Sequence, residues 1–258
     1  MFFVAGPCVI EGPGQLDEIA SALSAIADRH RLTLYFKASF DKANRTRGDA
    51  FRGPGLAQGL QMLADVKSRY GLQVITDVHG PEQCAPVAEV ADVLQVPAFL
   101  CRQTDLIVAA GQTGRVVNLK RGQFLDPRAM VHAVQKLPDP TRAWVTERGT
   151  TFGHGDLVFD PRSLIWLRAC GVPVVYDCTH SVQSPPGSNG GSGGHRHFAR
   201  PLARAAVAVG VQGLFTEVHP DPSKARSDAA TQLDPSAFEQ LVIETLSIAE
   251  ALDGHPQT

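Results

Sequence analysis

Short apolar runs recur along the chain, and stretches with helical periodicity lie between them. Rich in β-branched and aromatic residues, these runs predict eight strands, at 2–5, 34–39, 74–77, 93–96, 116–119, 144–147, 174–177 and 213–216. Most are nearly continuous rather than alternating, as in strands that are covered on both faces. Eight strand–helix units in about 250 residues predict an α/β fold, a (β/α)8 TIM barrel. A doubly wound sheet is the alternative, although it rarely has eight regular units.

Helical periodicity is clearest in two of the intervening segments. Leu56, Leu60, Leu63 and Val66 fall on one face of an expected helix. Near the C-terminus, apolar residues from 238 to 252 form a second stripe, with Asp234 as the expected N-cap and Pro235 at the first helical position. No linker or shift in composition interrupts the chain, so we expect a single catalytic domain over residues 1–258.

Residues 185–194, with the sequence PPGSNGGSGG, predict neither helix nor strand. The simpler interpretation is a flexible surface loop. The alternative is a mobile lid, because the segment follows the seventh predicted strand and would lie on the active-site face of a barrel.

Composition removes several classes of protein. The chain has 258 residues, is 43% hydrophobic and carries a net charge of −2, which excludes a disordered chain. Five cysteines spread over this length do not form a small disulfide scaffold. A pI of 6.5 argues against non-specific nucleic-acid binding. No apolar run is long enough to span a membrane and no signal peptide is apparent, so we expect a cytoplasmic protein with reduced thiols.

Polar and ionisable residues stand at or just beyond the C-terminal end of nearly every predicted strand. They are Cys8, Glu11, Lys37, Asp77, His79, Gln95, Lys120, Glu147, Arg148, Asp177, His180, Glu217 and His219. Solvation at a strand end explains any one of them. In a barrel, however, all these ends converge on one mouth, which favours a common site.

Five cations belong to this group or follow it closely: Lys37, Lys42, Arg45, Lys120 and Arg148. Such a density in a net-negative chain predicts a phosphorylated, polyanionic substrate. The alternative is a set of scattered salt bridges to carboxylates such as Asp41, Asp77 and Glu147. Because the chain has neither a P-loop nor a GxGxxG segment after a strand, a nucleotide cofactor is not indicated.

A thiol, an imidazole and two carboxylates form a second candidate group, Cys8, His180, Glu217 and Asp228. This mixture suits a divalent transition metal such as Fe, Zn, Mn or Co rather than Mg or Ca. The spacing alone is weak support, since the chain has no CxxC or HExxH pattern. Cys8 could instead be a small buried apolar residue, and His180 a hydrogen-bonded loop residue.

Several segments in order resemble the 3-deoxy-D-manno-octulosonate 8-phosphate synthase family over nearly the whole chain. KASFDKANR (37–45) is the most specific, because the related DAHP synthases carry a KPRTS-like segment there. ITDVH (75–79), LQVPAFLCRQTDL (94–106), NLKRGQF (118–124), ERGTTFG (147–153), DCTHSVQ (177–183) and TEVHPDP (216–222) follow. The resemblance implies a TIM barrel, usually homotetrameric. It also implies the condensation of phosphoenolpyruvate with arabinose 5-phosphate and water, for lipopolysaccharide biosynthesis.

Two segments resemble the metal-dependent branch of that family, AGPCVIE around Cys8 and SDAATQL around Asp228. Carried over by position, the resemblance implies that Cys8, His180, Glu217 and Asp228 bind the metal. The residues expected to take part in catalysis are Lys42, His180, Cys8 and Asp228.

The same resemblance implies the substrate contacts. Lys37, Lys42, Lys120 and Arg148 would hold phosphoenolpyruvate, and Asn44, Arg45 and Thr46 would meet the phosphate of arabinose 5-phosphate. Arg102 would come from a neighbouring subunit, while Asp77 and Gln95 would line the floor. The chain departs from the usual pattern at FGHGDL (152–157) and HRHF (195–198), outside the proposed metal ligands.

Other functions remain open at this point. A sister synthase of the DAHP or sialic-acid type would condense phosphoenolpyruvate with another aldehyde sugar. A metal-dependent aldolase on the same barrel would turn over without phosphoenolpyruvate. A non-catalytic sugar-phosphate-binding protein would lack an expected catalytic residue, and none is missing here.

Overall fold

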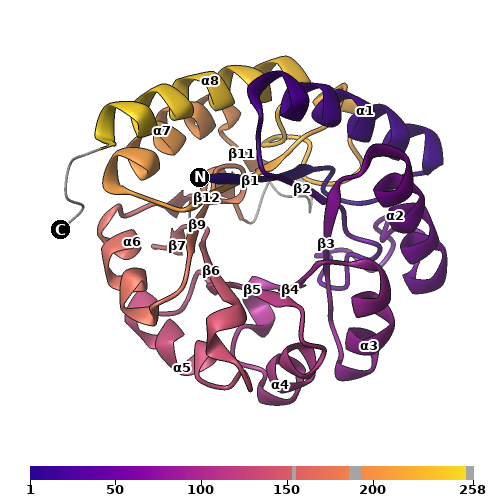
Figure 1. Cartoon of the computed structure of the whole chain (residues 1–258), viewed down its shortest axis with the longest axis horizontal. Helices are drawn as coiled ribbons and strands as arrows, with labels where there is room; N and C mark the ends of the chain where they lie inside the picture. The colour runs from indigo at the N-terminus through magenta and orange to yellow at the C-terminus, as the bar shows by residue number, and fades with distance from the viewer. Residues whose placement is uncertain (153–154, 186–192, 254–258) are drawn as a thin grey trace.

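The computed structural model describes residues 1–152, 155–185 and 193–253. Eight parallel strands close into a barrel in the order β1-β12-β9-β6-β5-β4-β3-β2, and helices surround it (Figure 1). The barrel strands are β1 (Phe2–Gly6), β2 (Leu34–Lys37), β3 (Gln73–Asp77), β4 (Val93–Val96), β5 (Val116–Lys120), β6 (Ala143–Glu147), β9 (Val174–Asp177) and β12 (Gly213–Glu217). The TIM barrel prediction is confirmed, and each predicted strand end lies within two residues of the observed one. Closure excludes the doubly wound alternative.

The α-helices occupy the segments between the barrel strands. They are α1 (Pro13–His30), α2 (Leu56–Tyr70), α3 (Pro81–Val90), α4 (Thr104–Gln112), α5 (Met130–Val134), α6 (Arg162–Leu167), α7 (Ala199–Val209) and α8 (Pro235–Leu252). The expected face of α2 is buried at Leu60, Leu63 and Val66. The Asp234 carboxylate accepts a hydrogen bond from the backbone N–H of Ala237, which confirms the predicted start of α8.

Short 3₁₀ turns occupy several of the connections. They are η1 (Ala98–Leu100), η2 (Pro127–Ala129), η3 (Pro140–Arg142), η4 (Arg168–Cys170), η5 (His180–Val182), η7 (Arg196–Phe198) and η8 (Pro222–Lys224). Among the helices that the structure describes, none combines the length and the apolar character needed to cross a bilayer.

Two antiparallel pairs of very short strands follow β6 and β9, and the sequence pattern did not predict them. β7 (Thr150–Thr151) pairs with β8 (Leu157–Val158), and β10 (Gln183–Ser184) pairs with β11 (Gly193–Gly194). The prediction of no strand in 185–194 is therefore wrong at its last two residues. Gly194 passes so close to its neighbours that a Cβ there would lie 2.2 Å from Thr231 Cγ2. Residues 186–192, the centre of the predicted lid, lie outside the described residues.

The interior of the barrel has an apolar layer below a polar one. Inward-facing Val4, Ile75, Val93, Trp144, Val175 and Phe215 form the apolar cluster. Side chains at positions i and i+2 of a strand share a face, so the next inward residues, towards the mouth, are polar. They include Asp77, Gln95, Thr146, Asp177 and Glu217. A larger apolar core, with Phe36, Leu94 and Leu214, packs the outer face of the barrel against the helices.

Candidate active site

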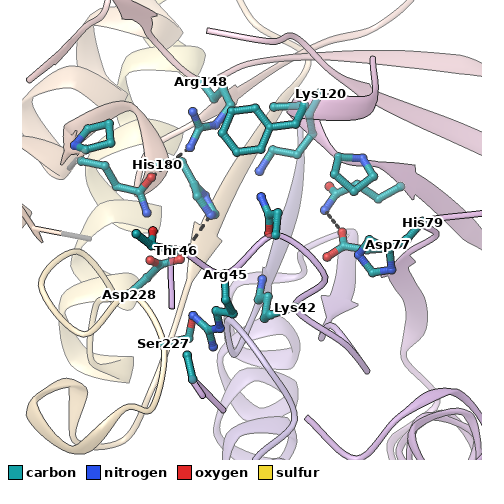
Figure 2. A pocket seen from close by; sticks show the side chains of 18 of the residues that line it. Lys42, Arg45, Thr46, Asp77, His79, Lys120, Arg148, His180, Ser227 and Asp228 are labelled. Carbon is teal, nitrogen blue, oxygen red and sulfur yellow. Dashed lines mark hydrogen bonds and ion pairs between the residues drawn. The ribbon is translucent and has the colours of Figure 1, made fainter. Parts of the chain in front are cut away.

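A cavity of about 430 Å³ opens at the C-terminal ends of the strands, and Figure 2 shows its lining from close by. Of the predicted residues, it gathers Lys37, Lys42, Asn44, Arg45, Thr46, Asp77, Gln95, Lys120, Arg148, His180 and Asp228. Seven lining residues are lysines or arginines, against two carboxylates, although the chain is net negative. This imbalance favours the binding of a polyanion.

Arg148 and Lys120 form one cationic end of this cavity. The Arg148 guanidinium donates to Gln123 Oε1 at 3.0 Å and to Gln183 Oε1 at 2.9 Å. Two neutral amides thus orient it without neutralising its charge. Lys120 Nζ lies 2.5 Å from Asp177 Oδ2 and 4.1 Å from the centroid of the Phe215 ring. Burial lowers the pKa of Lys120, although Asp177 opposes the shift.

The Lys37 ammonium forms its hydrogen bonds with groups of the protein itself. Its ammonium donates to Glu217 Oε1 at 2.9 Å and to the carbonyls of Cys8 and Pro7 at 2.8 and 3.3 Å. All three of its N–H groups therefore have partners, and its effect on a substrate is mainly electrostatic. Burial disfavours the charge on Lys42, but the acidic groups around it, Cys8 and Glu217 foremost, raise its pKa above the ordinary value. Lys42 thus remains a full cation.

Arg45 lies at another part of the wall. Its Nε donates to the Phe51 carbonyl at 2.9 Å, and its Nη1 donates to Ser227 Oγ at 2.7 Å. Its Nη2 is buried and has no hydrogen-bond partner among the described residues. A buried guanidinium nitrogen without an acceptor is well suited to receive an oxygen of an anion.

Four potential metal ligands from distant parts of the sequence meet beside the cationic groups. Ligand atoms of Cys8, Glu217 and Asp228 all lie within 4.8 Å of one another. His180 Nε2 is 3.5 Å from Glu217 Oε1 and 3.7 Å from Asp228 Oδ2. The second oxygen of Glu217 is buried and has no hydrogen-bond partner within residues 1–152, 155–185 and 193–253. Asp228 has a φ of 48°, a conformation uncommon outside glycine. An orphaned carboxylate oxygen among these donors fits a bound cation.

The electrostatics of this group match a site that exchanges protons for a metal. Burial raises the pKa of the Cys8 thiol well above its usual value, and Asp228 and Glu217 add to the shift. The thiol donates to Ser227 Oγ at 2.8 Å. Although burial opposes the shift, Lys37 and His180 lower the pKa of Glu217 to about 2. The site therefore holds a carboxylate ready for a cation and a thiol that must first lose its proton.

His180 is supported from behind by a carboxylate. Its Nδ1 lies 2.8 Å from Asp177 Oδ2. The backbone N–H of His180 donates to the other oxygen of Asp177 at 2.9 Å. A carboxylate behind an imidazole orients the ring and makes its free nitrogen a better ligand.

Comparison with protein families matches residues 1–252 to the DAHP synthetase I family. The chain belongs to this family. Its relatives include a 2-dehydro-3-deoxyphosphooctonate aldolase from Helicobacter pylori (strain Shi470), 50% identical over 95% of this chain and 94% of the relative. A protein of the same name from Bradyrhizobium sp. (strain ORS 278) is 52% identical over 96% and 88%. Another, from Wolinella succinogenes, is 47% identical over 97% and 100%. This is another name for 3-deoxy-D-manno-octulosonate 8-phosphate synthase, so the resemblance to that family is confirmed. Membership of its metal-dependent branch stays a prediction.

Some residues of this DAHP synthetase I family member were not assigned a role from the sequence. Ser227, Gln123 and Gln183 contact proposed site residues through hydrogen bonds. Gln123 and Gln183 lie inside the segments NLKRGQF and DCTHSVQ, but the sequence gives no reason to assign a role to an uncharged amide. Arg226 and Arg47 also line the cavity, in segments where no strand end drew attention to them.

Several predicted residues do not line the cavity: Cys8, Glu11, Glu147, Asp177, Glu217 and His219 at or after strand ends, and Arg102 between η1 and α4. Glu147 accepts from Arg121 Nε and Nη2, each at 2.6 Å, and both side chains are fully buried. This buried ion pair lies at the C-terminal end of β6, outside the cavity lining. The next residue, Arg148, does line the cavity. Arg102 is exposed and does not line the cavity of its own chain. Its contribution to the site of a neighbouring subunit stays a prediction.

Proposed function

We propose that this cavity condenses phosphoenolpyruvate with arabinose 5-phosphate and water, giving 3-deoxy-D-manno-octulosonate 8-phosphate and inorganic phosphate. A divalent transition metal bound by Cys8, His180, Glu217 and Asp228 is part of the proposal. The observation that carries it is a cavity lined by seven cationic side chains together with His180 and Asp228. Cys8 and Glu217 lie beside these two residues, behind the cavity lining. The two substrates together bring two phosphates and a carboxylate, which is the charge such a cavity binds.

Phosphoenolpyruvate binds at the end formed by Arg148 and Lys120, and Lys42 faces it from across the cavity (Figure 2). The guanidinium fork of Arg148 is fixed by Gln123 and Gln183, so it can grip a phosphate or carboxylate with little loss of side-chain freedom. Lys37 adds positive potential from behind. Holding the enol against the aldehyde in this way can lower the barrier by several kcal/mol, about 7–11 in the best cases.

Arabinose 5-phosphate binds with its phosphate towards Asn44, Arg45 and Thr46, where Arg45 Nη2 lacks a partner. Asp77 and Gln95 form the floor under the sugar. Arg102 reaches this end from a second subunit of a homotetramer. The same proposal treats residues 1–258 as one cytoplasmic catalytic domain.

The chemistry forms a C–C bond to the aldehyde carbon and a C–O bond to water, and it breaks the C–O bond to phosphate. C3 of the enol attacks the aldehyde carbon, whose oxygen gains the electron pair and then a proton. Positive character develops at C2, where water adds and loses a proton. Phosphate then leaves with cleavage of its bond to C2 and takes up the proton of the C2 hydroxyl group, which becomes the keto group of the product. The cations of the cavity stabilise the charge that builds on the aldehyde oxygen and on the departing phosphate.

The metal part of the proposal rests on the donor set. One thiol, one imidazole and two carboxylates suit Fe, Zn, Mn or Co, and the segments around Cys8 and Asp228 resemble the metal-dependent branch. When bound, such an ion supplies Lewis acidity, which polarises either the aldehyde or a water molecule. Asp177 keeps the His180 ring oriented towards the ligand group.

Release of inorganic phosphate tests the proposed function. The wild type should release phosphate from phosphoenolpyruvate with arabinose 5-phosphate, and much less with erythrose 4-phosphate. Exhaustive chelation should abolish turnover, and added Mn, Co or Zn should restore it. Cys8→Ala should stay folded but inactive, whereas Cys84→Ala, at a buried cysteine outside the cavity lining, should stay active. Full activity after chelation would contradict the metal, and a preference for erythrose 4-phosphate would contradict the substrate.

A further inference from the structure

A row of buried hydrogen bonds crosses the barrel interior from β6 to the segment after β2. Thr146 Oγ1 donates to Asn118 Oδ1 at 2.6 Å, and Asn118 Nδ2 donates to Gln95 Oε1 at 2.8 Å. Gln95 Nε2 then donates to Asp77 Oδ1, and Ser39 Oγ donates to Asp77 Oδ2 at 2.5 Å. The dashed line at Asp77 in Figure 2 marks the bond from Gln95.

The strand register builds this row. Asp77 is the partner of Gln95 in the β3–β4 pairing, and Gln95 is the partner of Asn118 in the β4–β5 pairing. Asp77 and Gln95 line the cavity, whereas Asn118 and Thr146 do not and are completely buried. The last two can therefore influence a bound molecule through Gln95.

The charge of Asp77 determines which group donates and which accepts in each hydrogen bond of the row. Burial opposes ionisation of Asp77, but Lys42, Lys37 and His79 hold the pKa of its carboxyl well below the usual range. At neutral pH Asp77 thus only accepts hydrogen bonds, so Gln95 must turn its NH₂ group towards it. The Gln95 carbonyl then needs a donor on its other side, which is Asn118. Thr146 in turn satisfies the Asn118 carbonyl oxygen.

We propose that Asn118 and Thr146 are positioning residues for the condensation, which hold Gln95 so that the cavity floor presents an N–H donor beside the Asp77 acceptor. This rests on the proposed function. Gln95 Nε2 has a second hydrogen beyond the one given to Asp77. A donor next to an acceptor matches a hydroxyl group, which can fill both roles. A carboxylate repels phosphoenolpyruvate, so this corner recognises a hydroxyl of the aldehyde sugar.

A matched pair of variants tests the role of the hydroxyl. Thr146→Val keeps the shape and removes the donor, whereas Thr146→Ser keeps the donor. With the buried Asn118 oxygen unpaired, Thr146→Val should lower kcat/KM for arabinose 5-phosphate about tenfold. The KM for phosphoenolpyruvate should change less than twofold, and Thr146→Ser should remain within twofold of the wild type. Equal kinetics in the two variants, or an equal rise in the KM for phosphoenolpyruvate, would overturn the proposal.

A double-mutant cycle with Gln95→Ala separates action through Gln95 from a general structural effect. In the Gln95→Ala background, Thr146→Val should cause no further loss, and the same loss in both backgrounds would contradict the proposal. Asn118→Ala is a second test of the same role. We expect the same loss of kcat/KM for arabinose 5-phosphate in this variant, once circular dichroism has shown that it is folded. A wild type without phosphate release would contradict the proposed function itself. An active wild type with indistinguishable Val and Ser variants contradicts only the positioning role.

Discussion

The Lys37 ammonium lies 2.9 Å from Glu217 Oε1, and both side chains are almost completely buried. The same ammonium donates to the carbonyls of Cys8 and Pro7, so it ties the end of β12 to the segment after β1. Lys37 therefore holds two of the proposed metal ligands in place through one charge. Without it, the Glu217 carboxylate would be buried with much less compensation.

Lys37→Met should destabilise the metal-free protein, because breaking a buried ion pair leaves an uncompensated charge. The free energy of unfolding should fall by about 3–5 kcal/mol, measured by urea titration after chelation. Adding Glu217→Gln to this variant removes that charge and should recover part of the loss. As a control, Arg52→Met breaks an exposed ion pair with Asp41 and should cost no more than about 1 kcal/mol. Equal losses in Lys37→Met and Arg52→Met would contradict this account.

Metal affinity should fall as the pH falls. Burial, with Asp228 and Glu217, raises the pKa of the Cys8 thiol, so a metal must displace a proton from sulfur when it binds. While the free protein keeps that proton, the dissociation constant should rise about tenfold for each unit that the pH is lowered. Competition titrations with Zn²⁺ and a chromogenic chelator at several pH values measure the slope. Cys8→Ser should bind Zn²⁺ more weakly, and binding should release one proton fewer, so the dissociation constant should depend less steeply on pH. An unchanged pH dependence would exclude sulfur as a ligand.

The eight strands and the polar ends were predictable because each rests on a local pattern. An inward-facing apolar residue such as Ile75 or Phe215 places the residue two positions later, Asp77 or Glu217, in the same barrel interior. The barrel geometry then brings these ends together. The gathering of Cys8 with Asp228, 220 positions away, was expected from the motif resemblance and not from spacing.

The unpredicted features depend on partners that are far away or uncharged. Ser227 accepts from Cys8 across 219 positions and also from Arg45, but an isolated serine gives no signal in the sequence. Arg121 and Glu147 look as available as Lys120 and Arg148 until the structure shows them paired. The two-residue strands β10 and β11 are too short for any periodicity, so their pairing could not be read from residues 183–194.

Arg148→Lys should weaken the binding of phosphoenolpyruvate, because a lysine ammonium cannot reproduce a fork that bonds Gln123 and Gln183 and also faces the cavity. We expect the KM for phosphoenolpyruvate to rise about tenfold, the loss of roughly one charge-assisted hydrogen bond. The KM for arabinose 5-phosphate should change much less. Arg128→Lys, at an exposed arginine paired with Asp126, is the matched control and should leave both constants unchanged. A KM that is unaffected in Arg148→Lys would remove this residue from the binding site.

Gly6→Ala should disturb both the barrel and the metal site. Gly6 has a φ of 154°, and a Cβ there would lie 2.0 Å from the Lys37 carbonyl oxygen, so β1 and β2 would have to separate. Because Cys8 follows two residues later, the shift should move its sulfur away from Glu217 and Asp228. We expect the free energy of unfolding to fall by about 2 kcal/mol or more and Zn²⁺ affinity to fall at least tenfold in the folded protein. Gly14→Ala has no atom within 4 Å of the added Cβ and should leave both unchanged. Wild-type Zn²⁺ affinity in Gly6→Ala would show that the ligand group tolerates a wider gap between the two strands.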